Sequence, residues 1–445
     1  MKKTISFPLL LFIFITIFEP PFLPVPFIYV QGLIEVLFLI IFKFVREKRI
    51  DLTIMNRSGI SHYMGFIIIL WLWILVARIV DVLFFNGMDS MSNFLRSTNQ
   101  LLVLTFIQFL NIGIIISCFR KCENPISRIF DYVVYAGVFQ GVLAILAYLI
   151  PIVRTMFLKF GGSVYSNEWL LQRRGYGFSL SLLDGFGYGM GLIAALVIFR
   201  FKKDGIKNNI IRCLQLALIV TSISLNSRTG FVIIAVAILA KLLLSTKVRI
   251  MLLKIPLTLI AVFVMYKVLI WLINKGLSSQ NITVKWISTD IGALLKSVFP
   301  AIGINVSASS SYSNNDNPYY SLLTDIELPH TPFQYLFGEG WQVYYGSQYG
   351  YRSDNGYINM AWMFGILGTI YYYVYNTFVN FRLLSKFDGK YYHILIFNVL
   401  ALFIYSAKGR PFGYYPGIVI FYLIIFSIMF FSNTNNSNKE KNDKI

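Results

Sequence analysis

The chain has 445 residues, of which 57% are hydrophobic and only 13% are charged. About a quarter of the residues in a soluble globular domain are charged, so this composition excludes an ordinary soluble protein. The formal net charge of +19 does not indicate a nucleic-acid partner, because the basic residues lie in short segments between apolar runs, as the positive-inside bias predicts.

Apolar runs of roughly 20 residues, the length that crosses a bilayer core as a helix, recur along the chain. They are continuous, whereas the strands of an outer-membrane barrel alternate in short segments, so we expect an all-α polytopic integral membrane protein. The first run follows Met1 to Lys3 without a small-residue cleavage site, and we expect a retained span. The expected spans, about 12 in number, are 5–18, 27–45, 63–85, 99–119, 129–150, 179–199, 209–226, 229–245, 250–273, 357–380, 391–407 and 415–432.

Basic residues are concentrated in alternate connections between these spans, which predicts that both termini lie in the cytoplasm. This orientation gives four regions: spans one to nine within 1–273, with an outer loop at 151–178; a large outer, periplasmic loop at 274–356; spans ten to twelve within 357–432; and a cytoplasmic tail at 433–445. The tail is polar and poor in hydrophobic residues, so we expect it to be disordered.

Five arginines lie at the outer ends of the expected spans, against the positive-inside bias. They are Arg173, Arg174, Arg228, Arg352 and Arg410. A guanidinium group offers a planar fork that matches a phosphate or a carboxylate, so the set could bind one anion. The alternative is that each arginine extends to the interface or pairs locally.

Four side chains of the large loop are candidate general bases: Asp354, Glu339, His330 and Asp325. Asp354 is expected to begin a helix two residues after Arg352, and the arginine would keep it ionised. The imidazole of His330 titrates near neutral pH, but it lies between two prolines and could simply pack in the loop. The loop is also rich in tyrosine, which suits either a membrane interface or a surface on which sugar rings stack.

Three stretches have a familiar order. They are Arg173-Arg174-Gly175 with Gly177; Ser227-Arg228-Thr229-Gly230; and Gly338 with Gly340, followed by Asp354-Asn355-Gly356-Tyr357 and Gly365-Ile366-Leu367-Gly368. They resemble, in this order, the upstream arginine-glycine element, the Ser-Arg-x-Gly stretch and the end of the large outer loop in the O-antigen polymerase family (Wzy-type), which is related to the O-antigen ligases.

The resemblance implies a metal-independent, inverting glycosyltransferase of lipopolysaccharide biosynthesis, with a GT-C-like helical fold in the bacterial inner membrane and no cofactor. The donor would be a glycan on undecaprenyl diphosphate, and the acceptor a hydroxyl of a second lipid-linked repeat unit. The arginines would hold the diphosphate, and Asp354 would take or orient the acceptor proton. Membrane lipid and a chain-length regulator protein are the other expected partners.

Two alternatives remain. A ligase would transfer the glycan to lipid A-core, but ligases carry a His-Asn pair where this chain has Asp354-Asn355, which favours a polymerase. A lipid-linked oligosaccharide flippase or exporter would need charges along the length of its spans, whereas here they gather at the outer ends.

Overall fold

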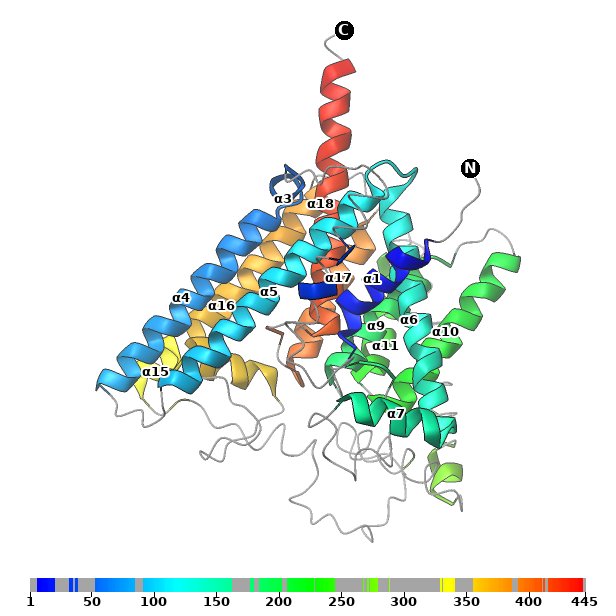
Figure 1. The fold of residues 1–445 in the computed structure, drawn as a ribbon, viewed down its shortest axis with the longest axis horizontal. Helices are drawn as coiled ribbons and strands as arrows, with labels where there is room; N and C mark the ends of the chain where they lie inside the picture. The colour runs from blue at the N-terminus through cyan, green and yellow to red at the C-terminus, as the bar shows by residue number, and fades with distance from the viewer. Residues whose placement is uncertain are drawn as a thin grey trace.

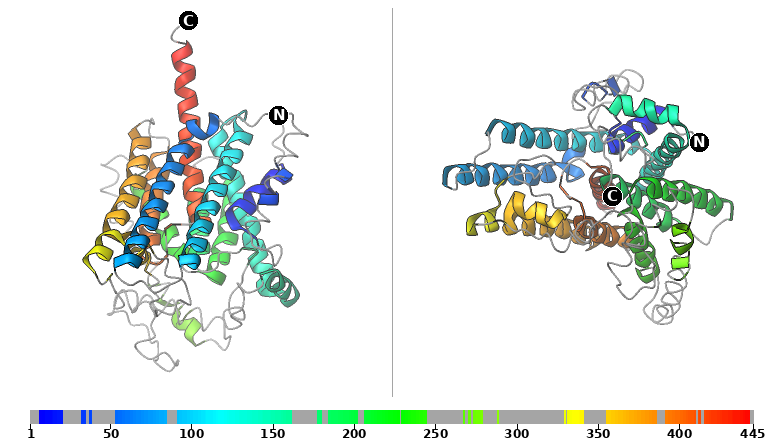
Figure 2. Two further views of the ribbon diagram at one scale, coloured as in Figure 1. Left: turned by 60° about the vertical axis from the view of Figure 1, so that its left-hand side comes forward. Right: turned by 90° about the horizontal axis from the view of Figure 1, so that it is seen from below.

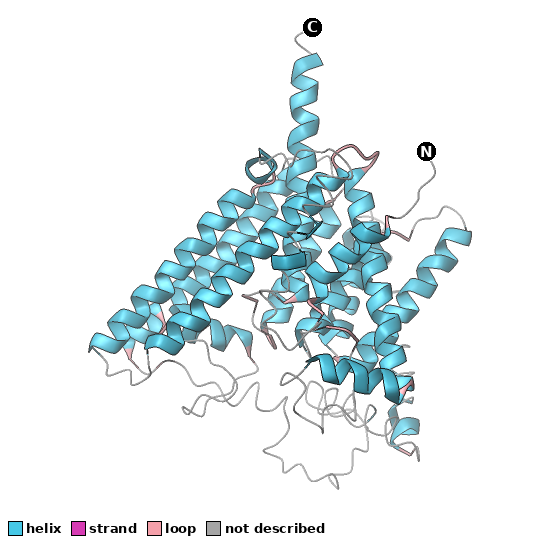
Figure 3. Ribbon diagram, in the orientation of Figure 1, coloured by secondary structure: helices cyan, strands magenta, loops and turns pink. Residues whose placement is uncertain are grey.

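The computed structural model describes residues 6–20, 53–84, 91–161, 177–179, 184–201, 206–227, 229–244, 329, 331–340, 355–385, 391–409, 411–412 and 415–442, with short pieces between 32 and 38 and between 267 and 288. Every regular element of this described part is a helix, so the all-α expectation is confirmed there (Figure 3). The helices are α1 (Phe7–Phe18), α3 (Thr53–Arg57), α4 (Ile60–Phe84), α5 (Met91–Phe119), α6 (Pro125–Leu149), α7 (Pro151–Gly161), α9 (Asp184–Phe199), α10 (Ile206–Asn226), α11 (Thr229–Leu244), α15 (Pro332–Phe337), α16 (Gly356–Ser385), α17 (Tyr392–Ser406) and α18 (Pro416–Asn442).

Four stretches of the described helices are long and apolar enough to cross a membrane, as expected of a membrane protein. They are Ile60–Phe84, Leu102–Phe119, Pro125–Leu149 and Asn208–Asn226. Shorter apolar helices occur at Phe7–Phe18, Gly185–Phe199, Thr229–Leu242, Tyr392–Ser406 and Pro416–Ser432. All of these lie close to expected spans, whereas the expected spans at 27–45 and 250–273 fall largely outside the described residues.

The helices form two groups that meet at α18 (Figure 1). Helices α4, α5 and α16 run side by side in one group, and α6, α9, α10 and α11 make up the other (Figure 2). Helix α18 contacts members of both groups, including α5, α9 and α16. Helix α1 packs on α6 and α9 through Phe14 against Phe139 and through Phe18 against Phe186.

Aromatic rings hold the first group against α18. Tyr63 of α4 is 1% exposed, and its ring centroid lies 5.1 Å from that of Tyr375 and 5.2 Å from that of Tyr422. Phe66 stacks on Tyr375 with centroids 4.0 Å apart. Because helices gain no hydrophobic drive by leaving lipid for each other, this close packing is what stabilises their association.

The helices run back and forth along the bundle, so their connections lie at its two ends. We call the end at which α6 finishes and α9 begins the loop end, since α7, α15, the starts of α11, α16 and α18 and the finish of α17 also lie there (Figure 1). We call the opposite end the basic end, and it contains the start of α6, the finish of α9 and the start of α10.

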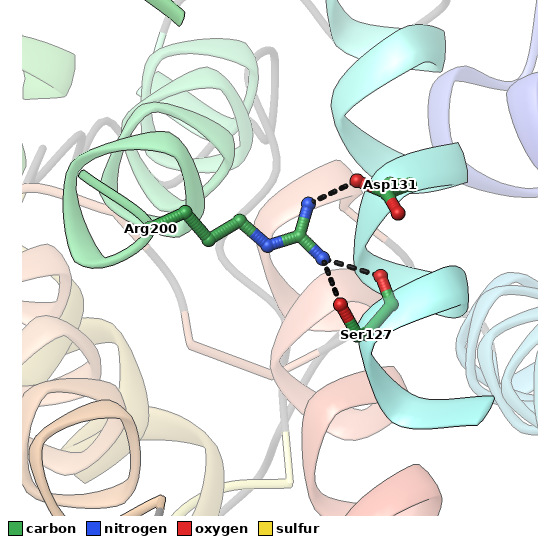
Figure 4. Close-up of polar contacts among 3 residues, drawn as sticks. All are labelled: Ser127, Asp131 and Arg200. Atoms are coloured by element: carbon green, nitrogen blue, oxygen red, sulfur yellow. Dashed lines mark hydrogen bonds and ion pairs between the residues drawn. The ribbon is translucent and has the colours of Figure 1, made fainter. Parts of the chain in front are cut away.

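The basic end is held together by two cations at the finish of α9. Arg200 donates from one guanidinium nitrogen to Asp131 Oδ1 at 2.6 Å and from another to the backbone carbonyl of Ser127, both on α6 (Figure 4). Lys241 of α11 donates to the carbonyl oxygen of Phe201 at 2.9 Å and also to that of Ile198. Cations at a helix C-terminus satisfy its last carbonyls and oppose its dipole.

Two features differ from the sequence expectations. Helix α18 continues to Asn442, where a disordered tail was expected from residue 433. Extending an existing helix avoids the cost of nucleation, so a polar segment of low hydrophobicity can follow an apolar span as helix. Helix α16 is interrupted at Gly365, whose φ of 67° and ψ of −178° are not helical.

Candidate functional site

Most of the candidate residues lie outside the described part of the chain. They are Asp354, His330, Asp325, Arg173, Arg174, Arg228, Arg352 and Arg410. Glu339 is described, and so are the residues directly before and after Arg228 and Arg410 and the residue after Asp354. The surroundings of these described neighbours can therefore be traced.

The turn between α10 and α11 lies directly against the first turns of α9. A methyl group built on Gly187 of α9 would lie 2.5 Å from Ser227 Oγ and 3.1 Å from the backbone nitrogen of Gly230. Gly191, one turn further along α9, meets Ile233 of α11 in the same way. Glycines four residues apart thus give α9 a smooth face on which the start of α11 rests.

The connection between α17 and α18 lies against the same turns of α9. A methyl group on Gly189 would be 2.8 Å from Pro416 Cβ. Tyr188, which is fully buried, stacks on Tyr405 of α17 with ring centroids 4.2 Å apart. The sequence Gly187-Tyr188-Gly189 therefore contacts Ser227 and Gly230 on one side, and Tyr405 of α17 and Pro416 of α18 on another.

The start of α16 joins this arrangement. Asn355 caps the helix, because its side-chain oxygen accepts hydrogen bonds from the backbone N–H groups of Tyr357, at 3.0 Å, and of Ile358. Gly356 lies in close contact with the carbonyl group of Gly409, so tightly that no side chain would fit at position 356. The Tyr357 hydroxyl donates to the Phe403 carbonyl at 2.7 Å.

Described residues adjacent to three candidate positions are therefore joined by a chain of contacts that begins at α9. Ser227, which precedes position 228, meets Gly187, and Tyr188 stacks on Tyr405. Tyr405 meets Gly409, which precedes position 410, and Gly409 meets Gly356, which follows Asn355. We call this chain of contacts, from Gly187, Tyr188 and Gly189 of α9 to Gly356, the glycine hub. The segment 177–179, which follows Arg173 and Arg174, lies instead on α6, where the Phe178 N–H donates to the buried Gln140 at 3.2 Å.

A second polar centre at the loop end contains Glu339. It starts from Arg78 and Asp81 of α4, which are 4% and 3% exposed and form an ion pair at 2.8 Å. Gln334 of α15 donates from its side-chain nitrogen to the other oxygen of Asp81 at 2.8 Å. Gln334 also closes a capping box with Thr331 at the start of α15, which fixes this short helix in register on α4.

Hydrogen bonds beside the interruption of α16 hold the segment that carries Glu339. The indole N–H of Trp73 donates to the carbonyl oxygens of Phe337, at 2.9 Å, and of Phe364, at 3.0 Å. The backbone N–H of Glu339 donates to the Trp362 carbonyl at 2.8 Å. Carbonyls that α16 does not use itself are thus bonded by α4 and by the segment that follows α15.

Burial of the carboxyl group, together with the nearby charge of Asp81, raises the pKa of Glu339 to about 7, and Arg78 opposes the shift. A carboxyl group with this pKa can exchange a proton at neutral pH, which suits acid–base chemistry. We call Glu339 with Arg78, Asp81 and Gln334 the carboxyl centre. The sequence signal for the pairing of Arg78 with Asp81 is the three-residue spacing of their opposite charges, which puts both on one face of a helix.

An aromatic ring packs the connection between α17 and α18 against α16. Phe412, in this connection, makes an edge-to-face contact with Phe364, next to the interruption, at 5.1 Å. It also lies 6.1 Å from Tyr372, whose hydroxyl donates to the Pro411 carbonyl at 2.5 Å. The residue after position 410 is therefore bonded to α16 close to the interruption.

Within the described residues, no group of three or more His, Cys, Asp or Glu side chains could hold a metal ion. The loop end offers a carboxyl group whose pKa is near neutral. It also offers backbone segments next to candidate arginines, and these segments are packed through glycines and aromatic rings. Comparison of the chain with protein-family models, with curated proteins and with solved structures finds no match.

Proposed function

We propose that this protein is an O-antigen polymerase, which joins oligosaccharide repeat units carried on undecaprenyl diphosphate at the outer face of the bacterial inner membrane. One observation supports this most directly. The glycine hub connects described residues adjacent to Arg228, Arg410 and Asp354, three positions that are widely separated in sequence. A polymerase needs cations for a diphosphate and an acceptor for a proton in one place.

In the proposed reaction, a hydroxyl group of the acceptor glycan attacks the anomeric carbon of the donor glycan. A new carbon–oxygen bond forms while the bond between the anomeric carbon and the diphosphate oxygen breaks. Undecaprenyl diphosphate leaves with the bonding electrons, and attack from the opposite side inverts the anomeric centre. The hydroxyl proton passes to a carboxylate, for which Asp354 is the first candidate and Glu339 the second.

Fixed cations are central to this proposal, because the leaving diphosphate gains negative charge in the transition state. Arg228 and Arg173 or Arg174 are proposed to meet that charge, with Arg352 and Arg410 as further candidates. Guanidinium groups suit the task, since they keep their charge and can bind a phosphate with two parallel hydrogen bonds.

The proposal includes a topology of about 12 spans with a GT-C-like arrangement, both termini in the cytoplasm and the loop end outside. The support is the clustering at the loop end of α7, α15 and the glycine hub, while α6 begins and α9 finishes at the basic end. The positive-inside bias then places the basic end in the cytoplasm.

The test is the lipopolysaccharide pattern of cells that carry Arg228→Ala in place of the wild-type gene. We expect the ladder of long chains to collapse to a band with a single repeat unit. Arg382→Ala is the matched control, because Arg382 is an exposed arginine in the last turn of α16, at the basic end. An unchanged ladder in Arg228→Ala, with normal protein level, would exclude the diphosphate role.

Deletion of the gene tests the reaction class itself. A band with one repeat unit supports a polymerase, because attachment to the core then still works. Core without any attached glycan would contradict the proposal. In that case, undecaprenyl-linked polymer accumulating outside would identify a ligase, and single units accumulating inside would identify a flippase.

A further inference from the structure

A group of basic side chains at the basic end comes from three neighbouring segments. Arg200 follows α9, Arg212 lies on α10 and Lys241 lies on α11. Helix α10 packs on both α9 and α11, so Arg212 lies on a helix next to those that carry Arg200 and Lys241, and its charge acts on both of them. All three side chains are partly buried, so they lie between the helices and do not simply extend into solvent.

Among the described residues, little negative charge lies beside this group of basic side chains. Asp131 of α6 pairs with Arg200 at 2.6 Å, as Figure 4 shows. Lys241 binds backbone carbonyls at the finish of α9, which carry only partial charge. Arg212 makes a long contact of 3.4 Å to Asn209 on its own helix. Three cations thus face one described carboxylate. The ion pair with Asp131 accounts for Arg200 and capping of α9 accounts for Lys241, but neither accounts for Arg212.

An exposed apolar face adjoins Arg212. Ile210, Ile211 and Leu214 of α10 are 55%, 48% and 61% exposed. In the apolar stretch Asn208–Asn226, which is long and apolar enough to cross a membrane, only 17% of the residues in the apolar window are buried inside the protein. This side of α10 is therefore available to acyl chains along the whole depth of a leaflet, beginning beside the basic group.

We infer that the basic end binds an anionic phospholipid, with the phosphate of its headgroup at Arg212, Arg200 and Lys241 and its acyl chains along the exposed face of α10. A phosphate would relieve the repulsion among the three cations, and basic pockets between helices at a membrane surface bind such headgroups. This site lies at the opposite end of the bundle from the glycine hub, and it does not depend on the proposed glycosyl transfer.

The test uses the full-length protein in a neutral detergent, with thermal unfolding followed as phosphatidylglycerol is added. We expect phosphatidylglycerol to raise the Tm, and phosphatidylcholine with the same acyl chains to leave it nearly unchanged. In Arg212→Gln, reaching half of the maximal shift should take about tenfold more phosphatidylglycerol, the effect of one lost charge-assisted hydrogen bond. Arg212→Lys, which keeps the charge, should retain most of the shift. Arg382→Gln is the control and should behave like the wild type.

Three results would overturn the inference. One is a full phosphatidylglycerol shift in Arg212→Gln. Another is an equal shift with phosphatidylcholine, which would mean that acyl chains alone stabilise the protein. The third is a shift produced by inorganic phosphate to which the lipid adds nothing, since the ligand would then be a free anion. Retained phosphatidylglycerol, counted by native mass spectrometry, should fall in Arg212→Gln relative to Arg382→Gln if the inference holds.

Discussion

Gln334 and Asp81 are 253 residues apart in sequence, yet the side-chain nitrogen of Gln334 donates a hydrogen bond to a carboxylate oxygen of Asp81 at 2.8 Å. Both residues are buried. Asp81 uses its second oxygen for Arg78, so a single carboxylate connects α4, its ion-pair partner and α15. This relationship fixes the segment that carries Glu339 and makes the carboxyl centre a sensitive point of the fold.

Replacing Asp81 alone should therefore be costly. Asp81→Leu leaves the Arg78 guanidinium buried without its carboxylate, and loss of one partner of a buried ion pair costs about 3–5 kcal/mol. The double variant Arg78→Met with Asp81→Leu removes both charges and should recover most of the Tm lost in the single variant. Equal Tm values for the single and double variants would show that the ion pair does not determine stability here.

Glu339 should make stability depend on pH. Because the pKa of Glu339 rises from 4.5 to about 7 on folding, the unfolded chain releases this proton at a lower pH than the folded protein does. The unfolded state then binds fewer protons, so the contribution of Glu339 to stability is full below the unfolded pKa and is lost as the pH rises through the folded one.

Thermal unfolding of the wild type and of Glu339→Gln over this pH range checks the prediction. The Tm of the wild type should fall relative to that of Glu339→Gln as the pH rises from 4.5 to about 7 and should change little beyond. The glutamine variant keeps the shape of the side chain and cannot ionise. Parallel pH profiles for the two proteins would contradict the assignment.

The glycine hub predicts that even one methyl group at Gly187 impairs activity. In Gly187→Ala the new carbon would press on Ser227 Oγ, now 2.5 Å from that position, and displace the turn between α10 and α11. We expect fewer and shorter chains in the lipopolysaccharide ladder. The control is Gly65→Ala on α4, where nothing lies within 4 Å of the new methyl group; it should match or slightly exceed the wild type in Tm, because alanine favours helix over glycine. A normal lipopolysaccharide ladder in Gly187→Ala would show that the glycine hub is not part of the proposed site.

Gly365 should tolerate no side chain. Its φ of 67° with ψ of −178° is a conformation that only glycine adopts readily, and a methyl group there would meet the backbone of Leu336 and Phe337. Gly365→Ala should lower stability by about 1–3 kcal/mol from backbone strain alone, with more from the clash. A Tm equal to that of the wild type would mean that α16 can close into a continuous helix at this point.

The long helices could be predicted from sequence, but the interruption of α16 and the short helices between the spans could not. Continuous apolar runs identify spans such as α4 and α6 because length and hydropathy are local properties. The interruption at Gly365 is stabilised by the segment after α15 and by Trp73, which lies 291 residues before Phe364 in sequence. Helices α7 and α15, inside the expected outer loops, are too short to show in a hydropathy pattern.

The candidate site, too, could be predicted from sequence only in part. Glu339 is one of the four candidate bases that the sequence predicts in the large loop, and its environment supports acid–base chemistry. Its dependence on Asp81 could not be foreseen, because nothing in the sequence pairs a span residue with a loop residue 253 positions later. The roles of Asp354, His330 and the five arginines stay predictions, since those residues lie outside the described part of the chain.

The interruption in α16 also has a mechanical consequence. The carbonyl oxygens of Trp362 and Phe364 are bonded by Glu339 and Trp73, so the segment after α15 replaces part of the internal ladder of a helix. If this segment swung away, the hydrogen bond from Glu339 to the Trp362 carbonyl and the one from Trp73 to the Phe337 carbonyl would be lost, at a net cost of about 1 kcal/mol each. The first half of α16, the segment after α15 and the loop-end half of α4 should therefore move together as one rigid unit, with slow amide hydrogen exchange at Glu339.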